Sequence, residues 1–306
     1  MTNFHSGFIA IIGRPNVGKS TLVNALLGQK VAAVSPKAQT TRRRQLGILT
    51  TETYQMIFVD TPGLHNPRHK LGEFLNQEAR ESLDGVDAIL WLVDATTDPS
   101  EDDERIASLL TGRTPLVLGL NKMDLVPAEA LAARRDAYQP LLLRDAETVT
   151  LSATRGDGLS ALLELLVSFL PVREAEFDAE QVTDLYEKEI AADLIREAAL
   201  LNLREEVPHG VAVRIDEFKE RENGMAYIAA TLFVERESQK GIVIGEGGKM
   251  LKIIGSMART EIEAMGGRRV FLELRVKVLK DWRNDEEWLR RFGYKLDKKR
   301  EVKRKK

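Results

Sequence analysis

A glycine-rich turn near the start of the chain has the residue types and spacing of a phosphate-binding loop. The stretch GRPNVGKS at 13–20 follows an apolar run, begins a helical pattern and matches GxxxxGK[ST]. Its backbone N–H groups and the helix N-terminus can hold a β-phosphate. Lys19 can bridge the β- and γ-phosphates, and the Ser20 hydroxyl can ligate Mg²⁺. A tight turn without a ligand is the alternative.

Two later stretches supply the other parts of a nucleotide site. Asp60 of DTPG ends a predicted strand, where its carboxylate can hold Mg²⁺ and the Gly63 N–H can reach a γ-phosphate. In NKMD (121–124), the Asp124 carboxylate can accept two hydrogen bonds from the N1–H and the amino group of guanine, and adenine has no such donors at that edge. Together with the phosphate loop, these stretches predict a GTP site.

The remaining base contacts come from the ends of two predicted strands. Asn121 and Lys122 shape the pocket, and the pair Ser152–Ala153 can offer a backbone N–H to guanine O6. An ordinary strand-to-helix turn with a capping Asp is the alternative for NKMD. The predicted nucleotide-binding residues are Gly13, Asn16, Val17, Gly18, Lys19, Ser20, Thr21, Asp60, Asn121, Lys122, Asp124, Ser152 and Ala153.

A second glycine-rich stretch, IVIGEGGKM at 242–250, lies more than two hundred residues further along. No hydroxyl residue follows its Lys249, so the stretch lacks a ligand for Mg²⁺ and is not a second nucleotide site. Glycine still lets backbone N–H groups approach a phosphate closely. A helix-turn-helix that merely needs glycine is the alternative.

Composition and charge narrow the class of protein. The chain has 306 residues, of which 43% are hydrophobic, and it contains no cysteine. This excludes a disulfide framework and a cysteine zinc site, and it is consistent with a reducing cytoplasm. No apolar run has the roughly 18 residues of a membrane-spanning helix, and the N-terminus does not resemble a signal peptide. Any membrane contact is expected to be peripheral.

Basic residues are concentrated near the C-terminus. The net charge is -2, yet residues 238–306 hold 20 basic and 10 acidic residues and end in KKREVKRKK. This pattern indicates a surface that binds a polyanion, with a solvated tail as the alternative. Charge alone does not distinguish RNA, DNA and anionic lipid.

The elements that must position these residues alternate between strand and helix. Apolar runs at 8–13, 54–60, 88–95, 115–121 and 148–153 predict strands, and helical patterns lie between them. Continuous apolar strands separated by helices predict an α/β domain with a mostly parallel sheet covered on both faces. Phosphate ligands should then lie at the carboxyl ends of the strands.

The order of elements changes after an acidic segment. We predict a GTPase domain at 1–172, a linker at 173–183 and a smaller α+β domain with a basic tail at 184–306. The second domain is expected to hold a helix at about 184–203, strands at 210–218 and 225–235 joined by the turn ENG, two short helices flanking the second glycine loop, and a strand at 271–279.

Nearly the whole chain resembles the Era family, the Ras-like GTPases that carry an RNA-binding KH domain. The resemblance lies in GRPNVGKSTLVNALLGQKVAAVSPKAQTTR, DTPGLHNPRHKLGEFLN, NKMD, SAT, VIGEGGKMLKIIG and KVLKDWRND. It implies a P-loop GTPase domain followed by a type II KH domain. It also implies that QTTR is the first switch, in which Thr41, with its neighbour Thr40 as the alternative, closes on Mg²⁺ and the γ-phosphate only in the GTP state.

The resemblance assigns roles for catalysis. It implies Lys19, Thr41 and Gly63 as catalytic residues and Ser20, Thr41 and Asp60 as metal ligands, with GTP or GDP and Mg²⁺ as cofactors. Many GTPases keep a glutamine directly after DTPG, but this chain has Leu64, which cannot position water and is expected to pack against the switch. Asn16 suggests K⁺ as an optional cofactor, because GTPases with this loop can coordinate a monovalent cation.

The second loop resembles the clamp of a type II KH domain, which holds about four single-stranded nucleotides. The implied RNA-binding residues are Ile242, Ile244, Gly245, Glu246, Gly247, Gly248, Lys249, Lys252 and Arg259.

The implied function is a GTP-hydrolysing switch that binds single-stranded rRNA and acts in assembly of the small (30S) ribosomal subunit, near the 3′ end of 16S rRNA. The expected protein is a cytoplasmic monomer. The alternative is a peripheral GTPase at the inner face of the cell membrane, with its basic end on anionic lipid. The glycine loop favours RNA, because lipid binding needs charge but no such clamp. A P-loop metabolite kinase is a third alternative, which NKMD argues against.

Overall fold

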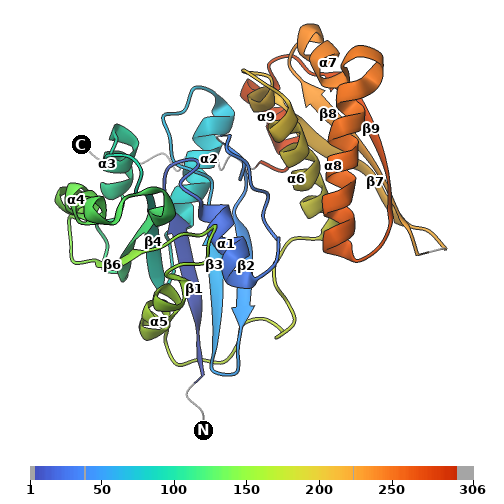
Figure 1. Cartoon of the computed structure of the whole chain (residues 1–306). Helices are drawn as coiled ribbons and strands as arrows, with labels where there is room; N and C mark the ends of the chain where they lie inside the picture. Colours follow the sequence, from blue (N-terminus) through green and yellow to red (C-terminus); the bar gives the residue numbers. More distant parts are fainter. Residues whose placement is uncertain (1–3, 38, 223, 295–306) are drawn as a thin grey trace, which may run out of the picture.

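The computed structural model describes residues 4–37, 39–222 and 224–294, which form two lobes, each built on its own β-sheet (Figure 1). The basic end KKREVKRKK lies outside the described residues, as does residue 223 of the predicted ENG turn. Within the described part of the chain, no helix combines the length and the apolar character needed to cross a membrane.

The first lobe contains a six-stranded sheet in the order β2-β3-β1-β4-β5-β6. Neighbouring strands are parallel, except that β2 is antiparallel to β3. The sequence patterns did not predict β2. The strands are β1 (His5–Ile12), β2 (Gln45–Thr50), β3 (Tyr54–Asp60), β4 (Ala88–Asp94), β5 (Leu116–Asn121) and β6 (Glu147–Thr150).

Helices cover both faces of this sheet, as the continuous apolar strands require. Leu22 of α1 and Leu162 of α5 belong to the core on one face, whereas Ala79 of α2, Ile106 of α3 and Tyr138 of α4 belong to the core on the other. The helices are α1 (Lys19–Leu27), α2 (Lys70–Glu81), α3 (Glu101–Ala107), α4 (Ala128–Tyr138) and α5 (Leu159–Phe169), with short 3₁₀ turns at Met123–Leu125 and Gln139–Leu141.

The segment predicted as a linker lies along the edge of the first sheet. Val182 accepts a hydrogen bond from the backbone N–H of Ile48 in β2, and Phe177 accepts one from the side chain of Gln55 in β3. The segment is therefore attached to the first lobe, although its composition suggested a free connection. The division of the chain at 172/173 and 183/184 stays a prediction.

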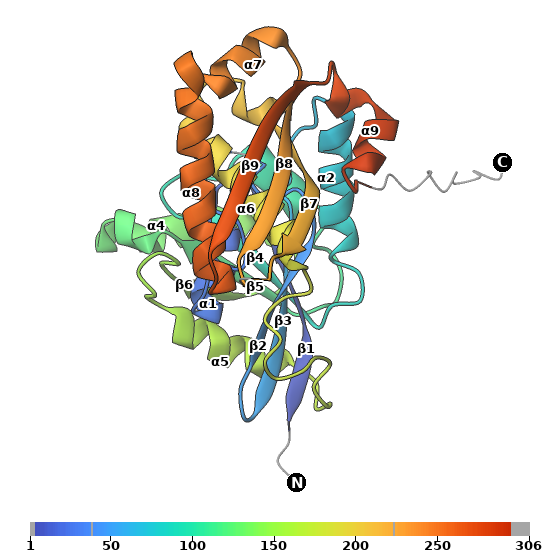
Figure 2. The same cartoon turned by 90° about the vertical axis from the view of Figure 1, so that its right-hand side faces the viewer.

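The second lobe contains a three-stranded sheet in the order β7-β8-β9, with α6 and α8 packed together on one face (Figures 1 and 2). β7 and β8 are antiparallel, and β8 and β9 are parallel. The elements are α6 (Glu187–Asn202), β7 (Ala212–Glu220), β8 (Ala226–Val234), α7 (Glu237–Ile244), α8 (Lys249–Gly266), β9 (Val270–Val278) and α9 (Glu286–Arg291), with 3₁₀ turns at Pro208–Gly210, Glu246–Gly248 and Trp282–Asn284.

Two helices of this lobe, α8 and α9, differ from the sequence prediction. The helix after the second glycine loop is not short: α8 has 18 residues. The helical pattern of α8 continues past its charged positions to Gly267, whose left-handed backbone ends it. The sequence patterns also do not predict α9, which has only six residues and packs against the other lobe.

An aromatic cluster joins the two lobes. Phe74 of α2 lies 5.2 Å from the ring of Tyr294, and Trp282 lies 5.2 Å from the ring of Phe292. Figure 2 shows α2 beside α9, where this cluster lies. The buried members of the cluster are Leu71, Phe74, Leu75, Ala212, Phe233, Trp282, Leu289, Phe292 and Tyr294.

Candidate functional site

The first glycine loop connects β1 to α1 and needs glycine at both of its ends. A Cβ at Gly13 would lie 2.2 Å from the Leu92 carbonyl oxygen, and one at Gly18 would lie 2.3 Å from the Asn121 amide nitrogen. Gly18 also has φ +101°, a backbone conformation that favours glycine. The chain therefore passes close to β4 and β5 and leaves its N–H groups at the N-terminus of α1, where an anion binds well.

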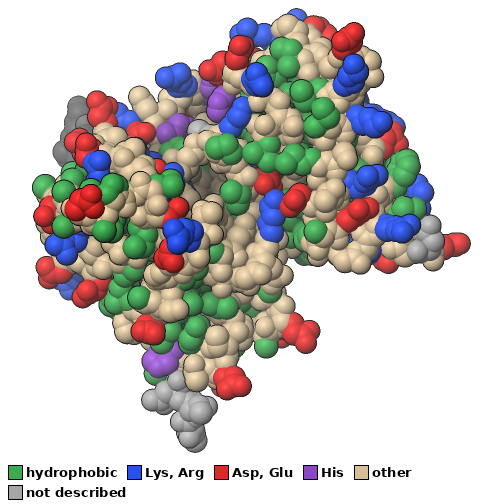
Figure 3. Space-filling view, viewed as in Figure 1, with side chains coloured by type: hydrophobic (Ala, Val, Ile, Leu, Met, Phe, Trp, Pro, Cys, Tyr) green, Lys and Arg blue, Asp and Glu red, His purple; other side chains and the backbone are tan. Residues whose placement is uncertain are grey.

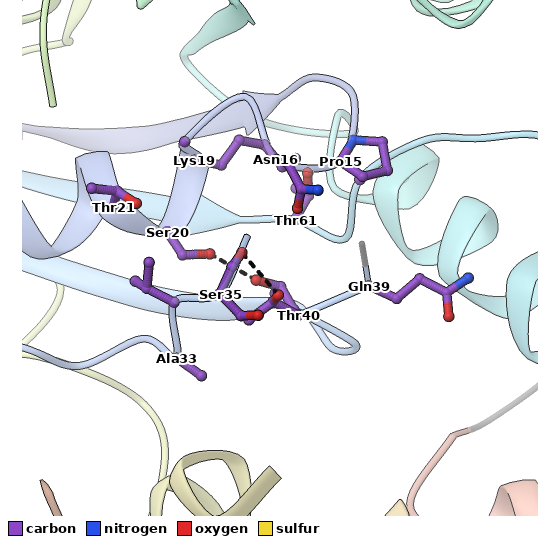
Figure 4. Close-up of a pocket in the computed structure, with 14 residues that line it drawn as sticks. Pro15, Asn16, Lys19, Ser20, Thr21, Ala33, Ser35, Gln39, Thr40 and Thr61 are labelled. Atoms are coloured by element: carbon purple, nitrogen blue, oxygen red, sulfur yellow. Dashed lines mark hydrogen bonds between the residues drawn. The ribbon is translucent and has the colours of Figure 1, made fainter. Parts of the chain in front are cut away.

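Lys19 lies buried beneath this loop (Figure 4). Its Nζ donates hydrogen bonds to the carbonyl oxygens of Gly13 at 3.1 Å and Arg14 at 2.8 Å. Burial lowers the pKa of Lys19 to about 8, against the attraction of the Asp60 carboxylate. A phosphate group in the loop would supply the negative charge that this ammonium group lacks.

Three oxygen-bearing side chains converge beside Lys19. Ser20 Oγ lies 2.7 Å from both Thr41 Oγ1 and Asp60 Oδ2, and Thr41 Oγ1 lies 3.3 Å from the same carboxylate oxygen. Burial raises the pKa of Asp60, and its Oδ1 is buried without a hydrogen-bond partner among the described residues. Hydroxyl and carboxylate oxygens are the ligands that Mg²⁺ prefers, so this group fits the ion.

Thr40 and Thr41 have different surroundings. Thr41 Oγ1 faces Ser20 and Asp60, whereas Thr40 Oγ1 donates to the carbonyl oxygen of Lys37 at 2.7 Å. Figure 4 shows Thr40 directed toward Ser35, away from Lys19. The structure thus brings Thr41, and not its neighbour, to the proposed metal ligands.

The DTPG segment passes close to the phosphate loop. A Cβ at Gly63 would lie 2.6 Å from the Pro15 backbone nitrogen, so only glycine allows this approach. Leu64 is 5% exposed and packs in the core with Ile12 and Trp91. Leu64 therefore packs as an apolar side chain, as burial of apolar surface favours, and its contact with the switch stays a prediction.

The sequence patterns did not predict a polar pair next to this segment, Gln39 and His65. Gln39 Nε2 lies 2.9 Å from His65 Nε2, and His65 Nδ1 lies 3.0 Å from the Gly63 carbonyl oxygen. Asn76 of α2 donates to the His65 carbonyl oxygen at 2.7 Å. The pair connects the first switch to DTPG, and Gln39 also lines the nucleotide pocket. The only indication of this pair in the sequence is that His65 lies close after DTPG.

NKMD is tied to the phosphate loop through its first residue. Asn121 Nδ2 donates to the Val17 carbonyl oxygen at 2.8 Å, and its Oδ1 accepts from the Ala153 N–H at 2.9 Å. Lys122 lies 2.5 Å from the Asp94 carboxylate at the end of β4. Asp124 is half-buried in the following turn. Four strand ends thus meet at one edge of the sheet.

The backbone N–H groups expected to bind guanine O6 already have partners. The Ser152 N–H donates to the Asp157 carbonyl oxygen, and the Ala153 N–H donates to Asn121. A hydrogen bond from Ala153 to O6 therefore requires that this N–H be shared with Asn121. Asn16, the residue that suggested K⁺, has φ +64° and donates from its side-chain amide to the Pro36 carbonyl oxygen at 2.7 Å.

The second glycine loop joins α7 to α8 through a 3₁₀ turn. Gly245, Gly247 and Gly248 all have positive φ, which other residues rarely adopt. A Cβ at Gly245 would lie 2.8 Å from the Met250 nitrogen, whereas Gly247 and Gly248 face open space. The backbone between Glu246 and Lys249 is thus bare at the N-terminus of an 18-residue helix.

A groove of about 420 Å³ begins at this loop and runs between α8 and β9. Lys252 and Arg259 line it, and Figure 3 shows Lys and Arg side chains together with hydrophobic ones over this lobe. Lys249 is exposed beside the loop. The lining residues are Gly248, Leu251, Lys252, Gly255, Ser256, Arg259, Leu272 and Leu274.

The apolar residues of this groove lie on α8 and β9, and the role of Ile242 and Ile244 in RNA binding stays a prediction. Ile242 is half-exposed on α7, and neither it nor Ile244 lines the groove. Leu272 and Leu274 of β9 line the groove because α8 packs against that strand. A Cβ at Gly255 would lie 3.3 Å from Leu274, so glycine permits this packing. In FLELRV of β9, apolar and charged residues alternate, which is typical of a strand with one face packed on a helix such as α8.

Two family models match the chain. One, described as 50S ribosome-binding GTPase, matches residues 8–122, and the other, described as KH domain, matches residues 206–283. The first therefore covers the phosphate loop, DTPG and the beginning of NKMD, and the second covers the glycine loop and the groove.

Named relatives match the chain almost from end to end. GTPase Era of Ruminiclostridium cellulolyticum is 47% identical over 297 residues, which cover 97% of this chain and 99% of that protein. A crystal structure of Era in complex with MgGDPNP and nucleotides 1506–1542 of 16S ribosomal RNA has a TM-score of 0.90 at 41% identity, covering 96% of this chain and 100% of that one. A variant of Era from Aquifex aeolicus bound to GDP·AlF₄⁻ has a TM-score of 0.91 at 40% identity, with the same coverage.

Proposed function

The chain belongs to the Era family of GTPases, and from this membership we propose a switch in which GTP controls the binding of single-stranded rRNA. The enzyme activity is hydrolysis of GTP to GDP and phosphate, with Mg²⁺ as cofactor. The proposed RNA is the 3′ region of 16S rRNA, because a related Era was crystallised with nucleotides 1506–1542 of that RNA. The proposed setting is assembly of the 30S subunit in the cytoplasm, by a monomer.

The proposed hydrolytic site uses the residues that converge at the carboxyl ends of β1 and β3. Lys19 binds the phosphates, and the Gly63 N–H reaches the γ-phosphate. Ser20, Thr41 and Asp60 would hold Mg²⁺, whose chemistry is to neutralise charge on the β- and γ-phosphates. Thr41 can make this contact only while the first switch is closed, so its position depends on the nucleotide.

One contact carries the proposal that the nucleotide controls the RNA-binding domain. Arg196 of α6 donates hydrogen bonds to the backbone carbonyl oxygens of Gln39, at 3.1 Å, and Thr40. These carbonyl groups directly precede Thr41. A switch that withdraws Thr41 from the metal must therefore move the groups that α6 holds, and α6 packs against α8 of the RNA groove. This connection is a two-state element that both ligands can bias.

The experiment is a titration of a labelled single strand with the sequence of the 16S rRNA 3′ end against two forms of the full chain. One form holds a GTP analogue and Mg²⁺, and the other holds GDP and Mg²⁺. We expect tight binding to one form and at least five-fold weaker binding to the other, and by linkage the RNA shifts nucleotide affinity by the same factor.

Equal RNA affinity in both forms would remove the switch from the proposal and leave two joined modules. A duplex of the same sequence is the control, and it should bind poorly because the clamp needs unpaired bases. Vesicles with anionic lipid test the alternative function. Binding to vesicles with no binding to the single strand would favour a peripheral membrane GTPase.

A further inference from the structure

A cavity of about 200 Å³ lies between the two lobes, on the far side of the first switch from the nucleotide. Its walls come from the switch, α6, β7 and the end of α9. They carry six basic side chains, two acidic ones and two aromatic rings. The charged and aromatic residues of the lining are Arg42, Arg43, Lys188, Glu189, Asp193, Arg196, Arg214, Arg291, Phe292 and Tyr294.

The most buried cation in this wall has no carboxylate partner among the described residues. Arg42 is 2% exposed, and it donates to the carbonyl oxygens of Val211 at 2.8 Å and His209 at 3.0 Å. Its guanidinium carbon lies 5.6 Å from the ring of Trp282. Its Nε makes no hydrogen bond with the described residues. A buried charge without a counter-charge is costly, so the position favours an anion nearby.

Electrostatic repulsion adds to this cost. Burial, together with the neighbouring guanidinium groups of Arg196 and Arg283, lowers the pKa of Arg42 to about 10, against the effect of Tyr294. An arginine normally keeps its charge at every accessible pH. The unfavourable surroundings thus act on a group that remains a cation near neutral pH.

The other cations of the cavity are partly neutralised. Two pair with acids of the lining itself, Arg43 with Glu189 and Arg196 with Asp193. Arg214 pairs with Asp216, at 2.6 Å. Arg291 pairs with Glu287, at 2.5 Å. Lys188 faces the ring of Tyr186 at 5.8 Å. Lys188 and Arg42 therefore leave a surplus of two positive charges around the cavity.

We propose that this cavity binds a small dianionic phosphate, either inorganic phosphate or the phosphate group of a small phosphomonoester. A dianion matches the surplus of two charges, and guanidinium groups suit phosphate oxygens geometrically. The volume is below the roughly 300–1,000 Å³ of sites for drug-sized ligands, so the ligand is little larger than its phosphate.

The position of the cavity favours a free ligand over a phosphate of bound RNA. The RNA groove lies between α8 and β9, whereas the cavity lies beside β7, at the opposite edge of the three-stranded sheet. The two sites share no lining residue. A strand that follows the groove therefore does not pass the cavity.

The cavity is adjacent to the nucleotide site through four consecutive residues. Thr40 and Thr41 line the nucleotide pocket, Arg42 and Arg43 line the cavity, and all four line a small recess of about 20 Å³ between them. A ligand held by Arg42 and Arg43 stabilises this position of the switch. Its affinity should therefore differ between the GTP-analogue form and the GDP form.

The experiment measures binding of inorganic phosphate by calorimetry to the full chain saturated with GDP and Mg²⁺, so that the phosphate loop is filled. Glycerol phosphate is a second probe. We expect one site per chain. The double variant Lys188→Ala/Arg291→Ala should weaken phosphate binding at least ten-fold, because both side chains lie at the cavity and outside the nucleotide site.

A matched variant controls for net charge. Lys240→Ala/Arg290→Ala also removes two cations from the second lobe, but neither residue lines the cavity, and it should bind phosphate like the unmodified chain. Absence of binding to the unmodified chain, or equal loss in both double variants, would overturn the proposal. Equal phosphate affinity of the GTP-analogue and GDP forms would overturn the coupling of the cavity to the switch.

A competition experiment distinguishes a free phosphate ligand from a phosphate of bound RNA. If the single-stranded RNA displaces inorganic phosphate and binds more weakly to Lys188→Ala/Arg291→Ala, the cavity holds an RNA phosphate and the proposal of a free ligand is wrong. GTP hydrolysis and RNA binding by the same variants are measured separately. A failure of the switch proposal is therefore distinguishable from a failure of this one.

Discussion

At the scale of single residues, the site depends on charges that are buried before any nucleotide arrives. Lys19 and Asp60 are both withdrawn from water, and burial shifts their pKa values toward the neutral forms. Among the residues that the structure describes, the Lys19 ammonium group is held by two carbonyl oxygens and by the attraction of Asp60. Both groups therefore gain more from a nucleotide and its metal than exposed groups would.

The pH dependence of nucleotide binding tests this state of Lys19. Its pKa is about 8 in the free protein, and bound phosphates raise it, so binding above pH 8 must take up a proton. We expect the Kd for GDP to be unaffected by Lys19 below about pH 7 and to be about ten-fold weaker at pH 9 than at pH 7. Calorimetry in buffers of different ionisation enthalpy also measures the proton uptake.

Lys19→Arg is the matched control for the pH experiment. Arginine keeps its charge throughout this range, so the variant should bind more weakly overall but with a flat profile between pH 7 and pH 9. A flat profile for the unmodified chain would show that Lys19 is already fully charged in the free protein.

Leu64 gives a second prediction at this scale. Because its side chain is in the core, Leu64→Ala should lower the free energy of unfolding by about 2–5 kcal/mol and change the hydrolysis rate far less than Lys19→Ala does. Urea unfolding and single-turnover hydrolysis measure the two effects. Leu143→Ala, at a leucine that is 63% exposed, is the control and should be nearly neutral. A large loss of rate with unchanged stability would place Leu64 at the reacting water.

At the scale of elements, both glycine loops stand at the N-terminus of a helix, α1 and α8. They differ in the residue that comes directly after the lysine. In the first loop, Ser20 reaches Asp60, whereas in the second loop Met250 packs against Gly245. We therefore expect the same local device to hold phosphates in two ways, one through a metal and one through backbone N–H groups alone.

The role of the second loop is tested by Gly248→Asp. The change puts a negative charge where the backbone faces open space, and we expect at least ten-fold weaker binding of the single strand with nearly unchanged GTP hydrolysis. Fluorescence anisotropy at several salt concentrations measures the loss. Affinity of the unmodified chain should fall with salt as Lys249, Lys252 and Arg259 are screened.

Gly267→Asp is the matched control for the loop variant. Gly267 has φ +62°, close to the φ of +81° at Gly248, and it also faces open space, but it ends α8 instead of beginning it. The backbone strain is therefore similar, and RNA binding should be retained. Equal loss in both variants would mean that distortion of α8, and not the loop, decides binding.

At the scale of the whole molecule, the first switch lies between a nucleotide site and a second lobe. Hydrogen bonds to backbone carbonyl oxygens cross this boundary from Arg42, Arg43 and Arg196. Lys30 forms ion pairs with Glu197 of α6 at 2.9 Å and with Glu261 of α8 at 2.8 Å. Among these residues, Glu261 alone is on the helix that lines the RNA groove. We therefore propose that the connection from nucleotide to RNA uses Arg196 and Glu197 of α6, the helix that packs against α8.

Arg196→Ala tests this connection. Removing its guanidinium group frees the carbonyl groups of Gln39 and Thr40, so RNA affinity should become the same in the GTP-analogue and GDP forms while both ligands still bind. Asp193→Asn removes the ion pair of Arg196 but keeps those hydrogen bonds, and it should preserve the difference. Anisotropy titrations of the three proteins compare the ratios. An unchanged ratio in Arg196→Ala would exclude α6 as the connection.

Patterns within short stretches determined much of this protein without any structure. Each glycine loop, DTPG and NKMD combines chemistry and spacing in a few residues, because backbone geometry alone fixes what such a turn can bind. The apolar strands likewise predicted the mostly parallel sheet and the edge at which Asp60 and Asn121 meet. The α+β order of the second lobe followed from the same periodicities, although β2 of the first lobe and α9 of the second were not predicted.

Contacts between distant segments were decided only by the tertiary structure. Leu64 lies in the core with residues of β1 and β4, Leu272 and Leu274 of β9 line the groove beside α8, and the predicted linker is attached along the edge of the first sheet. In the sequence, Arg42 is one of three consecutive arginines, which are typical of an exposed surface, yet it is buried between the two lobes. Burial depends on which surfaces meet, and residues 169 positions apart, such as Arg42 and Val211, meet only when both lobes have folded.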